Sequence, residues 1–134
     1  MTSARDTVAQ ERPRILLIED EPAVAAFLST ALERGGYAVV PSQSAARGLQ
    51  LLAAGRFHGV VSDIRTPGGI NGADVHDWIR RHRPEMATRI IFITGDTASE
   101  ETLALLAQAG TPCIEKPFRV HQFMAAVEKT IGKP

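Results

Sequence analysis

Five short apolar runs, each followed by a stretch with helical periodicity, constrain the fold of this chain more than any other feature. The first run is β-branched and leucine-rich without polar alternation, which is typical of a strand buried on both faces. The runs cover residues 14–18, 37–40, 58–62, 89–94 and 111–115. Strict alternation of strands and helices predicts an α/β fold, with a five-stranded parallel sheet and helices on both faces.

Residues that are typical of helix ends mark the expected helices between these runs. Pro22 lies at a plausible first helical position, and Gly35-Gly36 ends that helix. Ser44 is a candidate N-cap for the second helix, and Val75 to His82 form the third. Thr97 and Glu100 have capping-box spacing for the fourth, and Val120 to Ile131 carry the last. Periodicity does not give the strand order, but five units of this size commonly adopt the flavodoxin-like order 2-1-3-4-5.

Charged side chains follow three of the runs. Glu19 and Asp20 come after the first run, Asp63 after the third and Lys116 after the fifth. Charges at the ends of buried runs are costly unless they meet each other or a metal. If the runs are parallel strands, all four side chains converge at one carboxyl edge, which is where open α/β sheets bind ligands. In the order 2-1-3-4-5 the first and third strands are neighbours.

Clustered carboxylates raise one another's pKa, and a metal ion resolves that conflict. Carboxylate and carbonyl oxygens suit Mg²⁺, which keeps several waters and often bridges to phosphate. We therefore expect Glu19, Asp20 and Asp63 to hold Mg²⁺, and the carbonyl of Arg65, two residues past Asp63, is placed to assist.

A carboxylate can also attack a phosphoryl donor and form an aspartyl phosphate. Asp63 is the best nucleophile candidate, because its strand is central in the expected sheet. Lys116 would supply a positive charge and Thr94 a hydroxyl donor to the phosphoryl oxygens. Each of these residues alone is more often a turn, cap or strand residue, but their joint placement at one edge favours the functional interpretation.

Four segments at this spacing resemble the receiver domains of two-component response regulators. They are ILLIEDEP at 15–22, VVSDIRTPG at 60–68, IIFITG at 90–95 and IEKPF at 114–118, and the resemblance covers roughly residues 14–131. The resemblance implies a CheY-like signalling domain, switched by phosphorylation, that is not a turnover enzyme. Its phosphodonor would be a phosphohistidine on a sensor histidine kinase or a histidine phosphotransfer protein.

The resemblance also implies residue roles. Asp63 would be the phospho-acceptor. Asp20 and Asp63, with the Arg65 carbonyl, would bind Mg²⁺ directly, and Glu19 would act through water. Thr94 and Lys116 would contact the phosphoryl group, and the Lys116–Pro117 peptide is often cis in the family.

Two positions depart from the family pattern. Receivers commonly carry Tyr or Phe three residues before the lysine, where this chain has Cys113, so we expect an altered readout of phosphorylation. The loop after Asp63 contains an additional glycine in Gly68-Gly69. Arg65 and Asp96 are placed to form a gate over the phosphoryl group, a hypothesis that the aspartyl-phosphate lifetime of Arg65→Ala would test.

Composition limits the other functions. The 134 residues form one domain, expected at 14–131 between tails at 1–13 and 132–134, and 15 basic residues balance 15 acidic ones. This balance argues against direct capture of nucleic acid or membrane.

The basic stretch at 80–83 fits a helix C-terminus. The single cysteine is consistent with a reducing, cytoplasmic location. The oligomeric state does not follow from the sequence.

Three rival functions remain open at this point. An aspartate-nucleophile phosphohydrolase would commonly carry a second Asp where Arg65 stands. A flavin-binding module would need a phosphate loop without the acidic Glu19-Asp20-Glu21. A degenerate receiver that serves only as a protein-binding module would not need the complete acceptor and metal set. No output domain is recognisable after the receiver, so the chain is expected to be a stand-alone receiver or part of a hybrid kinase or phosphorelay protein.

Overall fold

The computed structural model describes residues 12–64, 69–95, 104, 107 and 110–134. These residues contain a parallel sheet of five strands in the order β2-β1-β3-β4-β5. The strands are β1 (Arg14–Ile18), β2 (Ala38–Ser42), β3 (Gly59–Asp63), β4 (Ile90–Thr94) and β5 (Cys113–Glu115). The predicted fold class and the order 2-1-3-4-5 are confirmed, and β3 is the central strand.

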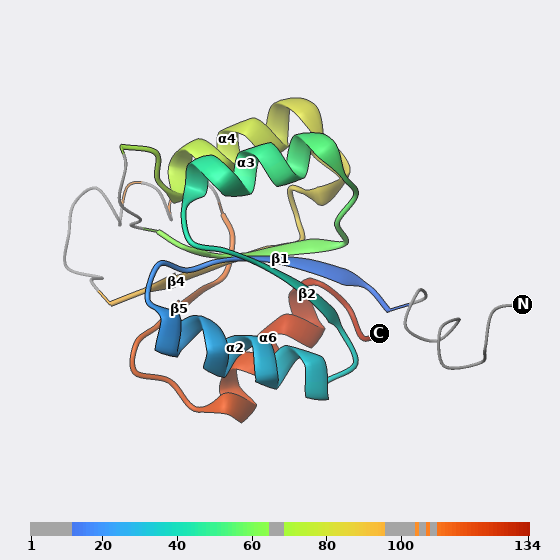
Figure 1. Ribbon diagram of the computed structural model, residues 1–134, viewed down its shortest axis with the longest axis vertical. Helices are drawn as coiled ribbons and strands as arrows, with labels where there is room; N and C mark the ends of the chain where they lie inside the picture. The colour runs from blue at the N-terminus through green and yellow to red at the C-terminus, as the bar shows by residue number, and fades with distance from the viewer. Residues whose placement is uncertain (1–11, 65–68, 96–103, 105–106, 108–109) are drawn as a thin grey trace, which may run out of the picture.

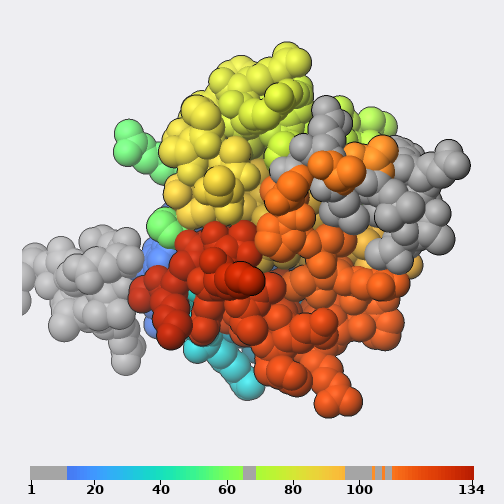
Figure 2. Space-filling model, turned by 180° about the vertical axis from the view of Figure 1, so that it is seen from behind, coloured from blue at the N-terminus to red at the C-terminus, as the bar shows by residue number. Residues whose placement is uncertain are grey.

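Helices cover both faces of the sheet, as predicted (Figure 1). Helices α3 (Ala45–Ala54) and α4 (Gly72–His82) lie on one face, and α2 (Pro22–Arg34) and α6 (Val120–Thr130) lie on the other. Seen from behind, the red C-terminal segment occupies the centre of the molecule, with the yellow end of α4 above it (Figure 2). None of the described helices has the length and apolarity that a membrane crossing requires. The predicted Thr97–Glu100 capping box lies outside the described residues.

Alternate side chains of the strands belong to two separate hydrophobic cores, because successive residues of a strand point to opposite faces of the sheet. The core under α3 and α4 takes Leu16, Ile18, Val60, Ile90 and Phe92 from the strands. The core under α2 and α6 takes Ile15, Leu17, Val61, Ile91 and Ile93. Both sets are fully buried, so the non-alternating apolar runs correspond to strands that are covered on both sides.

Local signals account for most of the helix ends. Pro22 is the first residue of α2, and the Ser44 hydroxyl accepts a hydrogen bond from the backbone N–H of Arg47, as a capping residue should. Helix α4 begins at Gly72, three residues before the predicted start. Its first turn is closed by a capping box between Asn71 and Asp74 that the sequence analysis did not identify.

Four of the five strands have boundaries that differ from the prediction. β3 spans 59–63 rather than 58–62, and β4 begins at Ile90 rather than at Arg89. The second strand was expected to span 37–40 and end at Pro41, but β2 spans 38–42 and includes that proline. Proline is tolerated there because β2 is an edge strand that pairs only with β1 within the described sheet. The fifth strand begins at Cys113 rather than at residue 111. A short 3₁₀ helix, η1 (Pro84–Met86), was also not predicted.

Candidate functional site

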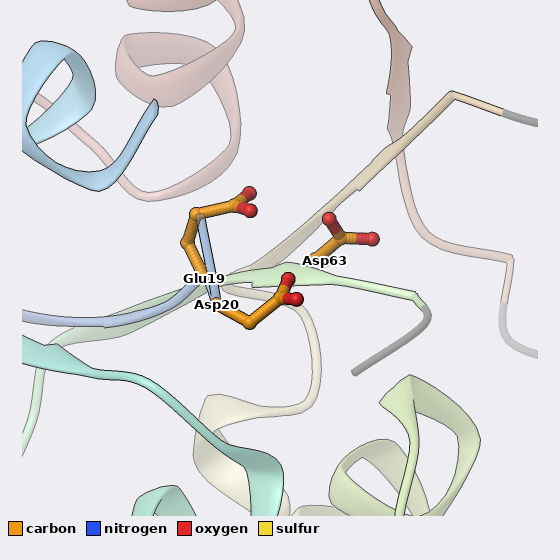
Figure 3. A group of neighbouring side chains, drawn as sticks. All are labelled: Glu19, Asp20 and Asp63. Atoms are coloured by element: carbon orange, nitrogen blue, oxygen red, sulfur yellow. The ribbon is translucent and has the colours of Figure 1, made fainter. Parts of the chain in front are cut away.

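The carboxyl ends of β1 and β3 bring three carboxylates together. Ile18 pairs with Ser62 in the parallel ladder, so the residues that follow, Glu19 and Asp63, lie side by side. One carboxylate oxygen from each of Glu19, Asp20 and Asp63 lies within 4.8 Å of the others. Their carboxylates point toward one another across the edge of the sheet (Figure 3). Adjacent strand ends therefore gather residues that are 43 or more positions apart in the sequence.

This group is unusually buried for charged side chains. Glu19 is 1% exposed and Asp63 is 8% exposed, whereas Asp20 is half-buried nearer the rim. Thr94 is 2% exposed at the end of β4, one residue beyond the pairing of Asp63 with Ile93. The acceptor candidate thus lies between the acidic pair on one side and Thr94 on the other, as the predicted strand order requires.

Lys116 supplies the positive charge of the group. Its Nζ lies 3.0 Å from Asp63 Oδ2 and 3.3 Å from Glu19 Oε2, and it donates a hydrogen bond to each carboxylate. The backbone N–H of Lys116 donates to the carbonyl of Thr94, which attaches the end of β5 to β4. The Lys116–Pro117 peptide is cis, as in many receivers. The lysine is therefore held against both buried carboxylates.

Burial and charge shift the protonation of this group in defined directions. Burial is the largest effect on Glu19 and raises the pKa of its carboxyl, and the nearby charge of Asp63 raises it further. The hydrogen bond from the Glu21 N–H and the ammonium of Lys116 oppose this rise and do not cancel it. Burial alone would lower the pKa of Lys116. The hydrogen bonds and charges of Asp63 and Glu19 outweigh that effect and raise this pKa, so the ammonium stays charged at neutral pH.

The donor set fits a small divalent cation. Three carboxylates offer hard oxygen ligands, the type that Mg²⁺ takes from proteins. When all three are ionised, the single ammonium of Lys116 leaves two negative charges unbalanced. The Arg65 carbonyl, expected to be a further ligand, lies outside the described residues, and so does the proposed Arg65–Asp96 gate.

One participant was missed by the sequence analysis. The backbone N–H of Glu21 donates to Glu19 Oε1 at 3.2 Å and orients that carboxylate. The exposed carboxylate of Glu21 lies 3.7 Å from the ammonium of Lys116. The run Glu19-Asp20-Glu21 contained the signal, but whether its third member faces the site depends on the turn that leads into α2.

Cys113 lies beside the site and not in it. Its side chain is half-buried next to the core under α3 and α4, and Phe92 is its register partner on β4. Burial raises the pKa of the thiol, and the charges of Glu115 and Asp63 add to this effect, so the thiol is protonated at neutral pH. A small neutral side chain therefore occupies the position where most receivers carry an aromatic ring.

Comparison with known proteins agrees with this geometry. The model of the response regulator receiver domain family matches residues 15–128. Nisin biosynthesis regulatory protein NisR of Lactococcus lactis subsp. lactis is 30% identical over 120 residues, which make up 90% of this chain and 51% of that protein. KDP operon transcriptional regulatory protein KdpE of Escherichia coli is 29% identical, over 89% of this chain and 51% of that protein. This chain spans about half the length of these two curated relatives.

Solved structures show the same fold. A CheY-like response regulator receiver domain protein from Methanospirillum hungatei superposes with a TM-score of 0.81 at 26% identity, covering 90% of this chain and 94% of that chain. The non-phosphorylated HemR receiver domain from Leptospira biflexa superposes with a TM-score of 0.78 at 29% identity, covering 92% and 97%. With this fold, these strand-end residues and a family match over most of its length, the chain belongs to the response regulator receiver domain family of two-component systems.

Proposed function

We propose that this receiver accepts a phosphoryl group on Asp63 from a phosphohistidine of a sensor histidine kinase or a histidine phosphotransfer protein. The observation that carries the proposal is the position of Asp63 on the central strand, hydrogen-bonded to Lys116 and within 4.8 Å of two other carboxylates. A buried nucleophile beside a fixed cation and a divalent-cation site is what phosphoryl transfer to a carboxylate requires.

The reaction forms one bond and breaks one. An oxygen of the Asp63 carboxylate attacks phosphorus, the phosphorus–nitrogen bond of the donor breaks, and the bonding pair leaves with the imidazole nitrogen, which takes a proton from solvent. The product is an acyl phosphate on Asp63 and a free histidine on the donor. Lys116, 3.0 Å from the acceptor carboxylate, then pairs with the phosphoryl oxygens, and the Thr94 hydroxyl donates to one of them.

Asp20 and Asp63, with the carbonyl of Arg65, would hold Mg²⁺ directly, and Glu19 would hold it through water. Bound Mg²⁺ supplies positive charge to the transferring oxygens and offsets the repulsion among the carboxylates. Glu19 keeps its orientation through the Glu21 N–H, so its carboxylate stays available while Lys116 turns toward the phosphoryl group.

Incubation with Mg²⁺ and either a small phosphodonor or a phosphorylated kinase tests the proposal. We expect an acid-stable, base-labile adduct that is lost in Asp63→Asn and absent when EDTA replaces Mg²⁺. Asp77→Asn, which changes an exposed carboxylate on α4, is the matched control and should label like the wild type. Labelling that survives in Asp63→Asn would contradict the assignment. A protein that never labels would indicate a receiver used only as a binding surface.

The receiver unit in this proposal comprises residues 14–131, flanked by 1–13 and 132–134. It acts in the cytoplasm as a switch that assists its own phosphoryl transfer, rather than as a turnover enzyme. Cys113 in place of an aromatic ring implies a different readout of the phosphorylated state. If Cys113→Ala kept phosphorylation but abolished the conformational response, this explanation of the readout would be wrong.

A further inference from the structure

A basic pocket lies at the edge of the sheet opposite the carboxylates. It has a volume of about 580 Å³ and is lined by Arg56, Phe57, His82, Arg83, Glu85, Met86 and Arg89. These residues come from the connection between α3 and β3, the end of α4, η1 and the residue that precedes β4. All of these elements meet at the amino edge of the strands, at the far side of the molecule from the start of α2 (Figure 1). The pocket is therefore separate from the site around Asp63.

Two of the three guanidinium groups in this pocket are held in place. Arg83 donates to the carbonyls of His82 and Leu52 and lies over the ring of Trp78, 5.6 Å from its centroid. Arg89 donates from Nε to the carbonyl of His58, which fixes one side of its guanidinium group. Side chains that are already oriented lose less conformational entropy when they bind a ligand.

The lining of the pocket carries three arginines and one carboxylate, so its charge is mainly positive. Among the residues that the structure describes, no carboxylate forms an ion pair with Arg56, Arg83 or Arg89. Glu85 is the one acidic residue in the lining and is exposed. Complementing the macrodipole of α4 explains Arg83. It does not explain Arg56 and Arg89, which come from other elements.

We propose that this pocket binds a small molecule that carries two or more phosphate groups. Guanidinium groups bind phosphate oxygens through paired, charge-assisted hydrogen bonds, and three of them exceed what a single phosphate needs. The volume lies within the range of about 300–1,000 Å³ that is typical of small-molecule sites. Phe57 and Met86 are the two apolar residues of the lining and are buried, with 7% and 3% of their surface exposed. The other five lining residues have polar or charged side chains, as a polyanion requires.

Calorimetric titration of the whole chain with inorganic pyrophosphate tests the proposal, with EDTA present so that no metal bridges the ligand to the carboxylates. We expect saturable binding that is tighter than that of inorganic phosphate and that weakens with salt. Arg56→Gln should weaken it by about tenfold, the equivalent of one lost charge-assisted hydrogen bond. Arg56 is suited to this test because its side chain is exposed and has no described protein partner, so the variant should fold.

Arg80→Gln and Asp63→Asn are the matched controls. Arg80 is an exposed arginine on α4 that is bound to Asp77 and lies outside the pocket, and Asp63 belongs to the opposite edge. Both variants should bind pyrophosphate like the wild type. Equal affinity in Arg56→Gln and the wild type, or no saturation at millimolar pyrophosphate, would overturn the proposal. So would binding through these arginines to duplex DNA or an acidic peptide but not to pyrophosphate. None of these outcomes depends on phosphorylation of Asp63.

Discussion

Glu19 is the most buried charged side chain in the described part of the chain, and its environment shows how the site tolerates carboxylates in a core. The Glu21 N–H and the Lys116 ammonium each donate to it, which offsets part of the cost of burial. Lys116 does the same for Asp63. The two buried carboxylates thus share one lysine as a charged donor.

Replacing that lysine should therefore destabilise the metal-free protein. We expect Lys116→Gln to lower the free energy of unfolding by about 1–3 kcal/mol, because two buried acceptors lose a charged donor. Urea unfolding in EDTA measures this change, and Mg²⁺ should recover part of it. Lys129→Gln, an exposed lysine on α6, is the control and should change stability by less than about 0.5 kcal/mol. An equal loss in both variants would show that Lys116 does not stabilise the carboxylates.

His76 predicts a pH dependence outside the site. Burial lowers the pKa of this imidazole from its ordinary value of 6.5, and the charge of Arg80 lowers it further while Asp77 opposes. Between pH 6.5 and the lower folded-state pKa, the imidazole of His76 is therefore protonated more often in the unfolded chain than in the folded chain. The stability that neutral His76 contributes is present above pH 6.5 and is lost as the pH falls through the folded-state pKa.

Comparison of His76→Gln with the wild type by urea unfolding between pH 7.5 and pH 5 measures this effect. The variant should lose less stability than the wild type as the pH falls below about 6.5. Gln122→Ala, which changes an exposed residue on α6 that does not titrate, should keep the wild-type profile. Parallel curves for His76→Gln and the wild type would contradict the assignment.

At the scale of elements, the start of α4 determines how the chain leaves the site. The Gly72 N–H donates to the carbonyl of Ile64, the residue after Asp63. A Cβ on Gly72 would lie 3.1 Å from the Cα of Ile64 and 3.0 Å from the ring of Phe92, so this close approach suits glycine. The capping box of α4 thus stabilises a segment that packs directly against the end of β3.

Removing this cap should destabilise the domain. Asn71→Ala deletes the acceptor for the N–H groups of Ala73 and Asp74, and we expect a loss of about 1 kcal/mol in the free energy of unfolding. Ser44→Ala, which removes a single capping bond on α3, is a useful comparison and should cost less. The two variants are compared by urea unfolding. A larger loss for Ser44→Ala would show that the reciprocal bonds of the α4 cap add no stability.

At the scale of the whole molecule, opposite charges collect at opposite edges of the sheet. Glu19, Asp20 and Asp63 lie at the carboxyl edge, and Arg56, Arg83 and Arg89 surround the pocket at the amino edge. The chain has no net charge, so its composition does not reveal this separation of charge. Each edge can therefore attract a ligand of opposite sign although the protein is neutral overall.

The carboxyl edge predicts a linkage between metal and stability. Mg²⁺ at ten times its dissociation constant should stabilise the fold by about 1.4 kcal/mol, because the ligand binds only the folded state. Thermal unfolding should show a rise in Tm that EDTA reverses. Asp20→Asn should raise the Tm without metal, because it removes repulsion, and should lose most of the increment from Mg²⁺. An undiminished increment in Asp20→Asn would contradict its assignment as a ligand; Asp77→Asn should behave like the wild type.

The sequence by itself determined the five strands and the described helices α2, α3, α4 and α6, because apolar periodicity and caps are local signals. It also placed Glu19, Asp20, Asp63, Thr94 and Lys116 at strand ends. Tertiary structure decided which of these meet, through the adjacency of β1 and β3 and the closure of β5 onto β4. It made β2 an edge strand that accepts Pro41.

Only the folded chain assembled the arginine pocket, because its residues come from separate elements and share no sequence motif. Distances between remote residues depend on crossovers and strand order, which no local pattern encodes.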